Sequence, residues 1–213
     1  MNLAKVREEL AVFLRNQNII TTAQRGVTTY TDSFTGNGAA TDFNLSKPGL
    51  KNVRSVLVNG LPISYGSAYE VNYESQVVTI TPAPGVVPVA IQYDAGVGDS
   101  IYPDLPRIDL DLTSYPRIGF DDISQANSEQ ALNAELLRTD TLISLVVYAA
   151  TKEECLRLWQ LCRDAIRANK KAFYHFCFIT LAGAGPLGPS AGRHDKIVQK
   201  NQDFRIPFEH EVN

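Results

Sequence analysis

The one stretch of the sequence that matches a cofactor-binding motif is Gly183-Ala-Gly-Pro-Leu-Gly188. Glycines at this spacing, with an acidic residue about twenty positions later, bind the pyrophosphate and ribose of a dinucleotide, and Asp203 has that place here. The motif works only where it opens a helix whose N-terminus faces the phosphates. Because Pro186 and Pro189 disfavour such a helix, we interpret the segment as an exposed loop and expect no cofactor.

Histidines, cysteines and paired carboxylates form no catalytic or metal-binding pattern. The histidines are scattered and lack partners at ligand spacing: His175, His194 and His210. Cys155 and Cys162 lie seven residues apart on a predicted helix, too far to bridge, and we expect them, like Cys177, to be buried apolar side chains. Asp109 and Asp111 share the polar face of a predicted strand, as is common on solvated surfaces. We therefore predict no catalytic residue, no metal site and no enzyme activity.

One cationic cluster remains, on the same predicted helix: Arg157, Arg163, Arg167, Lys170 and Lys171. It could complement the helix dipole, form ion pairs with another subunit or contact phosphates. Glu153 and Arg157, four residues apart, favour an ordinary solvated face. No aromatic residues alternate with the charges, and the formal net charge of −3 disfavours tight nucleic-acid binding.

The helix that carries this cluster has clear start and packing signals. Thr151 can cap it, while Glu154 can reach back to the cap in a capping box. One apolar stripe follows at helical spacing: Cys155, Leu158, Trp159, Cys162, Ala165 and Ile166. We expect this stripe to pack against a sheet.

Further helices and strands are predicted on either side of the β-rich residues 27–98. Residues 3–15 have the apolar spacing of an amphipathic helix, and residues 107–113 alternate as a strand does. Residues 136–148 end in a nearly continuous apolar run typical of a central strand. The chain ends in an alternating strand over residues 204–209, where Pro207 indicates a sheet edge.

Residues 27–98 differ in composition from the rest of the chain. They hold only eight charged residues and no helical periodicity. Asn59-Gly60 between two apolar runs predicts a hairpin, and residues 69–73 and 77–80 predict another. Val89, Ile91 and Tyr93 share one face of a further strand.

The predicted fold is therefore an α+β or α/β domain with a small antiparallel β-sandwich-like domain inserted into it. A mixed sheet flanked by two main helices comprises residues 1–26 and 99–213, and the insertion comprises residues 27–98. The total of 213 residues suits this division. The longest apolar run, residues 143–150, is far shorter than the roughly 20 residues of a membrane span, so we expect no membrane association.

The order of these elements resembles the tail terminator (tail completion) proteins of long-tailed bacteriophages. The resemblance covers about residues 1–20 and 105–213. It rests on the helix over 3–15, the strands over 102–112 and 142–149, the helix after Thr151, the Gly183 loop and the terminal strand from Asp203. The insertion, with Asp32-Ser-Phe-Thr-Gly-Asn-Gly38 and Tyr69-Glu-Val-Asn-Tyr73, is similar to a β module of phage tail and neck proteins.

The resemblance implies a structural virion protein that is assembled in the host cytoplasm. It implies a hexameric ring at the head-proximal end of the tail tube, which ends tube polymerisation and provides the head or neck attachment surface. The implied partners are further copies of the chain, the tail tube protein, a neck or head-completion protein, and double-stranded DNA that passes through the lumen without specific binding.

Three alternatives stay open: a head–tail connector or neck adaptor, a cytosolic nucleotide-binding enzyme that uses the Gly183 loop, and a carbohydrate-binding module. The third would use Tyr65, Tyr69 and Tyr73, which we expect instead to pack within the module or between subunits. We expect subunit or partner contacts in two long loops, Asp121–Arg138 and Gly183–Arg193, and on the basic helix. The candidate residues are Asp121, Asp122, Glu129, Glu135, Arg138, Arg163, Arg167 and Arg193.

Overall fold

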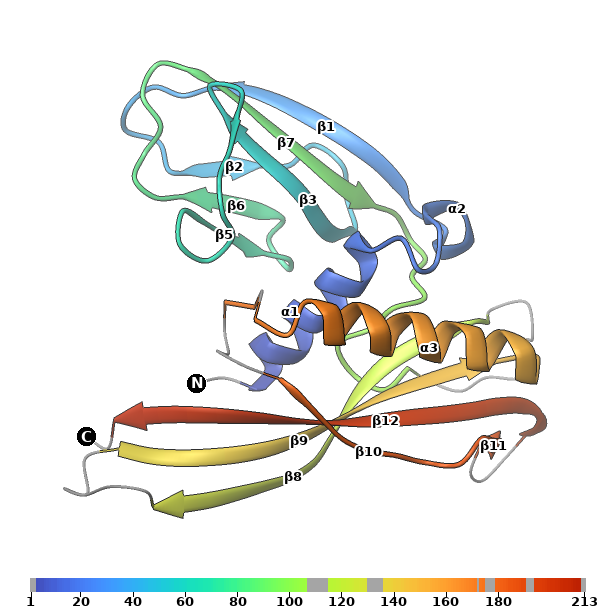
Figure 1. Cartoon of the computed structure of the whole chain (residues 1–213). Coiled ribbons are helices and arrows are strands. Elements are labelled where there is room, and N and C mark those ends of the chain that lie inside the picture. Colours follow the sequence, from blue (N-terminus) through green and yellow to red (C-terminus); the bar gives the residue numbers. More distant parts are fainter. Residues whose placement is uncertain are drawn as a thin grey trace. The chain divides into compact units, whose positions relative to one another are not determined.

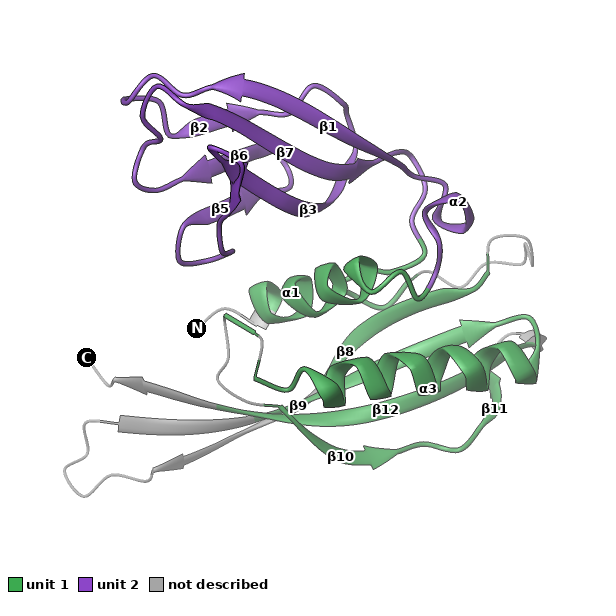
Figure 2. Ribbon diagram, turned by 45° about the horizontal axis from the view of Figure 1, so that its top comes forward, with its two compact units in different colours: residues 1–19, 100–213 green, residues 20–99 purple. Residues whose placement is uncertain are grey.

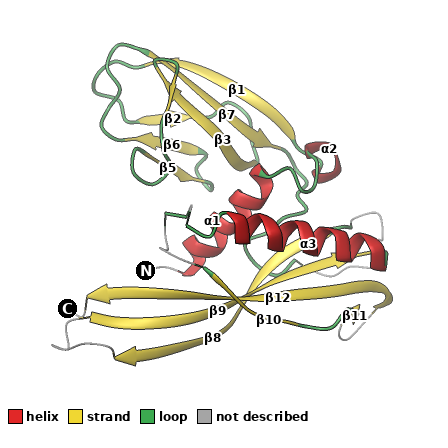
Figure 3. Ribbon diagram, viewed as in Figure 1, coloured by secondary structure: helices red, strands yellow, loops and turns green. Residues whose placement is uncertain are grey.

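The chain folds into two compact units, one formed by Met1–Ile19 with Ser100–Asn213 and the other by Ile20–Asp99 (Figure 2). The computed structural model describes residues 3–106, 115–129, 136–171, 173–174, 179–190 and 194–211. Both units combine helices with antiparallel sheets. The fold therefore belongs to the α+β class, which confirms the predicted class (Figures 1 and 3). The second unit contains the whole of the stretch 27–98 and begins seven residues before it.

The first unit begins with α1 (Leu3–Asn16), and the rest of its elements follow the second unit in the chain. These are β8 (Arg117–Glu129), β9 (Leu136–Ala149), α3 (Lys152–Ala168), β10 (Thr180–Ala184), β11 (Gly188–Ser190) and β12 (His194–Glu211). The strands form one sheet in the order β10-β12-β9-β8, with β11 also paired to β12. The apolar spacing predicted for α1 is confirmed, because Val6, Leu10 and Leu14 are fully buried.

Strand β9 is central, as its apolar run predicted. Backbone pairing joins it to β12 on one side and β8 on the other. Leu145, Val146, Val147 and Tyr148 are all buried, which is the pattern of a strand covered on both faces. The strand predicted over residues 107–113, with Asp109 and Asp111, lies outside the described residues.

The prediction that the last strand lies at a sheet edge is only partly right, because β12 pairs with β9 and, up to Arg205, also with β10. Pro207 is tolerated there for a local reason. It pairs with Asp140 of β9, whereas the pairing with β10 stops at Arg205. A proline without an N–H can therefore occupy an inner strand where that strand extends past its shorter neighbour.

The second unit consists of α2 (Thr22–Arg25) and two antiparallel sheets. The larger sheet has the order β1-β7-β3-β4, from Thr28–Thr35, Pro88–Ala95, Leu50–Val58 and Leu61–Pro62. The smaller has the order β2-β6-β5, from Asp42–Asn44, Val77–Ile80 and Tyr69–Asn72. Both predicted hairpins are confirmed, because β3 pairs with β4 and β5 with β6. Asn59 and Gly60 have the positive φ angles, 52° and 75°, that their turn requires.

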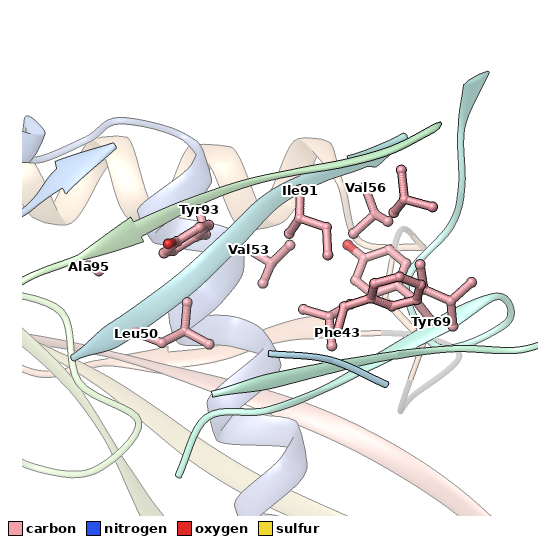
Figure 4. Packing of buried hydrophobic residues seen from close by; sticks show 11 residues of the cluster. Phe43, Leu50, Val53, Val56, Tyr69, Ile91, Tyr93 and Ala95 are labelled. Carbon is pink, nitrogen blue, oxygen red and sulfur yellow. The ribbon is translucent and has the colours of Figure 1, made fainter. Parts of the chain in front are cut away.

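Buried side chains from both sheets of this unit form one core (Figure 4). Val89, Ile91 and Tyr93 of β7 contribute one face of their strand to it, as predicted, and each is at most 1% exposed. Phe43 and Tyr69 come from the smaller sheet. Each sheet therefore buries its apolar face against residues of the other, which is what makes a two-sheet unit of about 80 residues stable.

A buried network of charged groups closes the base of the second unit. Arg25, at the end of α2, is 1% exposed. Its guanidinium donates to Asp94 at 3.1 Å, to Asp99 at 3.2 Å and to Asn52 at 3.2 Å. Arg54 donates to both carboxylate oxygens of Asp94, at 2.7 and 2.9 Å. The network thus ties the segment that enters the unit to β3, β7 and the segment that leaves it.

Helix α2, which positions Arg25, has only four residues and was not predicted. It begins with a capping box in which Thr21 accepts from the backbone N–H of Gln24 while the Gln24 side chain accepts from Thr21. Gly26 ends it at φ 67°. The segment that enters the second unit and the segment that leaves it pass close to each other at this point, because a Cβ on Gly98 would lie 2.7 Å from the Arg25 carbonyl oxygen. Gly98 therefore allows the leaving segment to pass Arg25.

Replacement of the buried arginine should destabilise the second unit. Arg25→Met leaves the buried Asp94 carboxylate with one cationic partner fewer and removes the ion pair between Arg25 and Asp99. We expect the free energy of unfolding to fall by about 3–5 kcal/mol, as for other broken buried ion pairs. Urea denaturation monitored by circular dichroism measures this. Arg157→Met, at an exposed position, is the matched control and should change it by less than about 0.5 kcal/mol. Equal unfolding midpoints for the two variants would contradict the role of the network.

The same network predicts a loss of stability in acid. Burial by itself raises the pKa of Asp94, but hydrogen bonds from Arg54 and Thr29 and the charges of Arg54 and Arg25 outweigh it, so the pKa is lowered. An aspartate whose pKa is lower in the folded state than in the unfolded state stabilises the fold at pH values above its unfolded-state pKa, which is about 3.9. This stabilisation is lost as the pH falls through the folded-state pKa. Denaturation between pH 7 and pH 3 should show this decrease, and Asp94→Asn should lessen its slope. An unchanged slope in the variant would contradict the assignment.

Candidate assembly surfaces

The structure places most of the predicted contact residues on two regions of the first unit. Asp121, Asp122 and Glu129 lie in β8, and Arg138 lies in β9. Arg163 and Arg167 lie in α3. Glu135 and Arg193 lie outside the described residues. The candidates are thus divided between the β8–β9 hairpin and the outer side of α3.

The prediction of a long polar loop from Asp121 to Arg138 is wrong, because most of the segment is a hairpin. Strand β8 continues to Glu129, which pairs with Leu137 of β9, with an irregularity between Asp122 and Ser124. The sequence from Asp121 to Gln130 lacks the alternation of apolar residues that predicts a strand. Backbone pairing to β9 satisfies the N–H and carbonyl groups regardless of that pattern, so tertiary context overrides the local signal.

The two aspartates at the start of this hairpin have different environments. Asp121 is exposed. Asp122 lies 3.6 Å from Arg7 of α1, which also forms an ion pair with Asp104 at 2.6 Å. Residues next to each other in a strand face opposite sides of the sheet, so Asp122 faces α1 and Asp121 faces away from it. Asp121 is therefore exposed on the side of the sheet away from α1, and Asp122 is exposed on the side that carries α1.

A polar row crosses the sheet on the side of Asp121. Asp121 pairs with Ser144 of β9, and Ser144 pairs with Asp203 of β12. The Ser144 hydroxyl donates to Asp203 at 2.8 Å, and the Asn201 amide lies 3.4 Å from the same carboxylate oxygen. In the part of the chain that the structure describes, no group of three His, Cys, Asp or Glu side chains could hold a metal ion. These hydrogen bonds hold the side chains of Ser144, Asn201 and Asp203 in place on the surface of the sheet.

Helix α3 buries the stripe that its sequence predicts. Thr151 caps it by accepting from the backbone N–H of Glu154 at 3.3 Å. Cys155, Leu158, Trp159, Cys162 and Ile166 are buried, whereas Ala165 is partly exposed. Burial raises the pKa of Cys155 to about 11 and that of Cys162 further. Both thiols are therefore protonated at neutral pH, as expected for side chains that only pack; Cys177 lies outside the described residues.

Trp159 joins α3 to β12. Its indole N–H donates to the backbone carbonyl of Asn201 at 3.2 Å. Two cations lie over its ring at 4.7 Å, the Arg163 guanidinium and the Lys200 ammonium. Lys200 also donates to the Gly185 carbonyl at 2.8 Å. Lys200 was not predicted; it lies two residues after buried Val198 and so on the same face of the strand, which is the signal that could have placed it beside the helix.

The outer side of α3 is basic. Arg157, Arg167, Lys170 and Lys171 are exposed, and Leu161 between them is 43% exposed. Arg163 forms an ion pair with the neighbouring Asp164 at 2.8 Å. No ion pair within the described residues joins Arg157, Arg167, Lys170 or Lys171 to a carboxylate, although Glu153 was expected to pair with Arg157. These four cations, of which Lys170 and Lys171 follow the end of α3, are together with Leu161 called the α3 basic face below.

The prediction of an exposed loop from Gly183 to Arg193 is partly wrong. Gly183 lies in β10, and Gly188 begins β11, so the described residues of this segment form two short strands joined by residues 185–187. Both strands pair with β12. A strand, and not a helix, follows Gly188, so the helix N-terminus that a dinucleotide motif requires is not formed by residues 183–190. Close packing explains the glycine at position 185 instead, because a Cβ there would meet the Asn201 side chain.

The three tyrosines considered for carbohydrate binding pack within the second unit, as expected. Tyr69 is 8% exposed, and Tyr65 and Tyr73 pack against the same core. The rings of Tyr65 and Tyr69 meet edge to face at 5.6 Å. The ring of Tyr69 is therefore used in packing, and Tyr65 and Tyr73 are partly buried against the same core.

Comparison with known proteins does not assign the chain to a family. No protein-family model matches the sequence, and no curated protein matches it. Among the described residues, no helix has the length and apolar character needed to cross a membrane.

Replacement of Trp159 tests how much the contact between α3 and β12 contributes to the stability of the first unit. Trp159→Ala removes a large buried ring, an N–H donor and the surface on which two cations stack, so we expect a loss of about 3–5 kcal/mol in the free energy of unfolding. Trp159→Phe keeps most of the apolar area and should cost about 1–2 kcal/mol. Denaturant unfolding of both variants measures this. Equal losses for the two would show that the ring itself contributes little.

Proposed function

We propose that this chain is a structural virion protein of the tail terminator type. In this proposal, copies of the chain form a hexameric ring at the head-proximal end of a phage tail tube. One side of the ring fits the tube protein and the other does not repeat that surface, so tube growth stops there. The second side then offers the attachment surface for a neck or head-completion protein, and DNA passes through the lumen without specific binding.

The order of elements in the first unit is the observation that carries the proposal. An amphipathic α1, the apolar part of β9, a capped α3 packed on the sheet and a terminal β12 follow one another in the order on which the resemblance rests, whereas β8 occupies much of the segment expected to be a polar loop. The α3 basic face and Asp121 of β8 are exposed parts of this unit that can serve in assembly. Such work is geometric, because it requires complementary surfaces and not a reactive group.

Loss of the gene from a virus that encodes it should produce tails of variable and excessive length that are not joined to capsids. Electron microscopy of the lysate measures tail length and attachment, and expression of the chain in trans should restore both. Purified protein should be hexameric, or should assemble on tail tubes, by light scattering coupled to size-exclusion chromatography. Uniform tails joined to capsids in the absence of the chain would exclude the terminator function. Normal tails without attached heads would instead indicate the connector alternative.

A further inference from the structure

Strand β1 lies at one edge of the larger sheet of the second unit (Figure 1). The structure describes every residue of this unit. Among them, β7 is the one strand that pairs with β1, in an antiparallel register that continues from Thr28 to Thr35 without a bulge. The other edge of β1 is therefore regular along its whole length.

Two hydrogen bonds determine which backbone groups of β1 point away from β7. Gly36, the residue after β1, donates to the carbonyl of Val87, which lies opposite it, at 2.9 Å. Bonds to a given neighbour alternate along an antiparallel strand, so the even-numbered residues of β1 bond to β7. Asn59 donates to the Pro88 carbonyl at 2.8 Å, which agrees, because it directs the even-numbered residues of β7 toward β3. The odd-numbered residues of β1 therefore direct their N–H and C=O groups outward: Thr29, Thr31, Ser33 and Thr35.

These outward backbone groups have no hydrogen-bond partner within the residues that the structure describes. The side chains of the same four residues are exposed, and each is a small hydroxyl side chain. The Thr29 hydroxyl donates to Asp94 at 2.7 Å, which leaves the backbone of Thr29 unaffected. The edge is therefore open to another molecule and offers it alternating donors and acceptors.

The other three edges of the two sheets in this unit are closed by local features. Strand β4 has two residues, Leu61 and Pro62, and proline has no N–H to donate. Strand β2 has three residues. Strand β5 is bordered by the loop before it, because Gly66 donates to the Tyr69 carbonyl at 2.7 Å. Short strands, prolines and covering loops are means by which proteins prevent pairing at sheet edges. Strand β1 has none of these.

The core side of β1 carries two aromatic rings with one carboxylate between them. Tyr30 and Phe34 pack against the core of the unit and are partly exposed. Asp32 accepts hydrogen bonds from the backbone N–H and the hydroxyl of Ser46, at 2.6 and 2.8 Å, and from the Tyr93 hydroxyl at 3.0 Å. A charged side chain that points inward opposes pairing at an edge when it needs water. These three hydrogen bonds reduce that need.

We propose that the β1 edge binds an extended segment of a partner protein, which adds a fifth strand to this four-stranded sheet. Hydrogen-bond complementarity determines the class of partner, because a second extended backbone carries donors and acceptors at the repeat of the outward groups. The segment has apolar side chains at alternate positions, beside Tyr30 and Phe34. Its intervening side chains are polar and lie beside Thr31 and Ser33. The inference concerns the second unit and does not rest on the proposed function.

A second copy of β1 suits this edge less well than a partner segment does. An antiparallel pair of β1 strands that places Tyr30 opposite Phe34 also places Asp32 opposite Asp32. Like charges directly opposite each other destabilise a strand pair. A segment of different sequence avoids this repulsion.

A peptide with the sequence of residues 89–95 of β7 is a suitable probe, because its apolar side chains alternate with others in the required way. In fluorescence anisotropy with the full-length chain, we expect a dissociation constant below about 1 mM. Ser33→Pro removes an outward N–H without removing a bond to β7, and it should weaken binding at least about tenfold. Ser33→Val keeps the N–H and is the matched control, which should bind within about threefold of the original chain. Thermal unfolding confirms that both variants are folded.

Amide hydrogen exchange of the original chain, followed by nuclear magnetic resonance, tests the same edge without a substitution. Without peptide, the N–H groups of Thr31 and Ser33 should exchange at least about tenfold faster than those of Tyr30, Asp32 and Phe34. Saturating peptide should slow the exchange of Thr31 and Ser33 at least about tenfold, because their N–H groups are then hydrogen-bonded.

Three results would overturn the inference: no binding of the peptide at about 1 mM, equal binding to the Ser33→Pro variant, or binding that leaves the exchange of Thr31 and Ser33 unchanged. Self-association of the original chain that Ser33→Pro abolishes, without peptide binding, would overturn it as well and assign the edge to a second copy. Sedimentation velocity over a concentration series measures that association. Tails of normal length in a virus that lacks the chain would contradict the proposed function and leave this inference standing.

Discussion

The second unit depends on the ionic contact between Arg25 and Asp94. Both side chains are removed from solvent, and each charge would be costly there without the other. Asp94 lies at the end of β7, and Arg25 lies just before β1, so the contact brings together the two ends of an inserted segment. An insertion is compatible with a host domain only when its ends lie close together. The network therefore lets a separate β core interrupt the first unit without interrupting that unit's own packing.

In the first unit, the corresponding constraint is the packing of α3 on the central strands. Trp159 combines apolar burial with a hydrogen bond to β12, and the cations over its ring link the helix surface to the sheet. This packing fixes which residues of α3 remain outside. The α3 basic face is consequently held in place by the packing of the helix on the sheet.

Local sequence signals predicted the elements whose formation depends on neighbours in the chain. The cap at Thr151, the turn at Asn59-Gly60 and the apolar run of β9 each express a short-range requirement: an orphan N–H, a positive φ or burial on both faces. Such requirements can be read without knowing the fold. The same holds for the α+β class and for the buried stripe of α3, since periodicity alone defines them.

The tertiary structure alone decided the features that depend on distant residues. Nothing near Arg25 in the sequence indicates that it pairs with Asp94, 69 residues away. The polar segment after Asp121 forms a strand because its backbone pairs with β9. Gly183 lies in the sheet because its segment pairs with β12. Backbone hydrogen bonds between strands take little account of side-chain character, so such pairings leave little trace in the sequence. The sequence by itself therefore determined the local elements and the charges of the α3 basic face, and only the fold determined which distant residues pair, because that pairing depends on neighbours far apart in the chain.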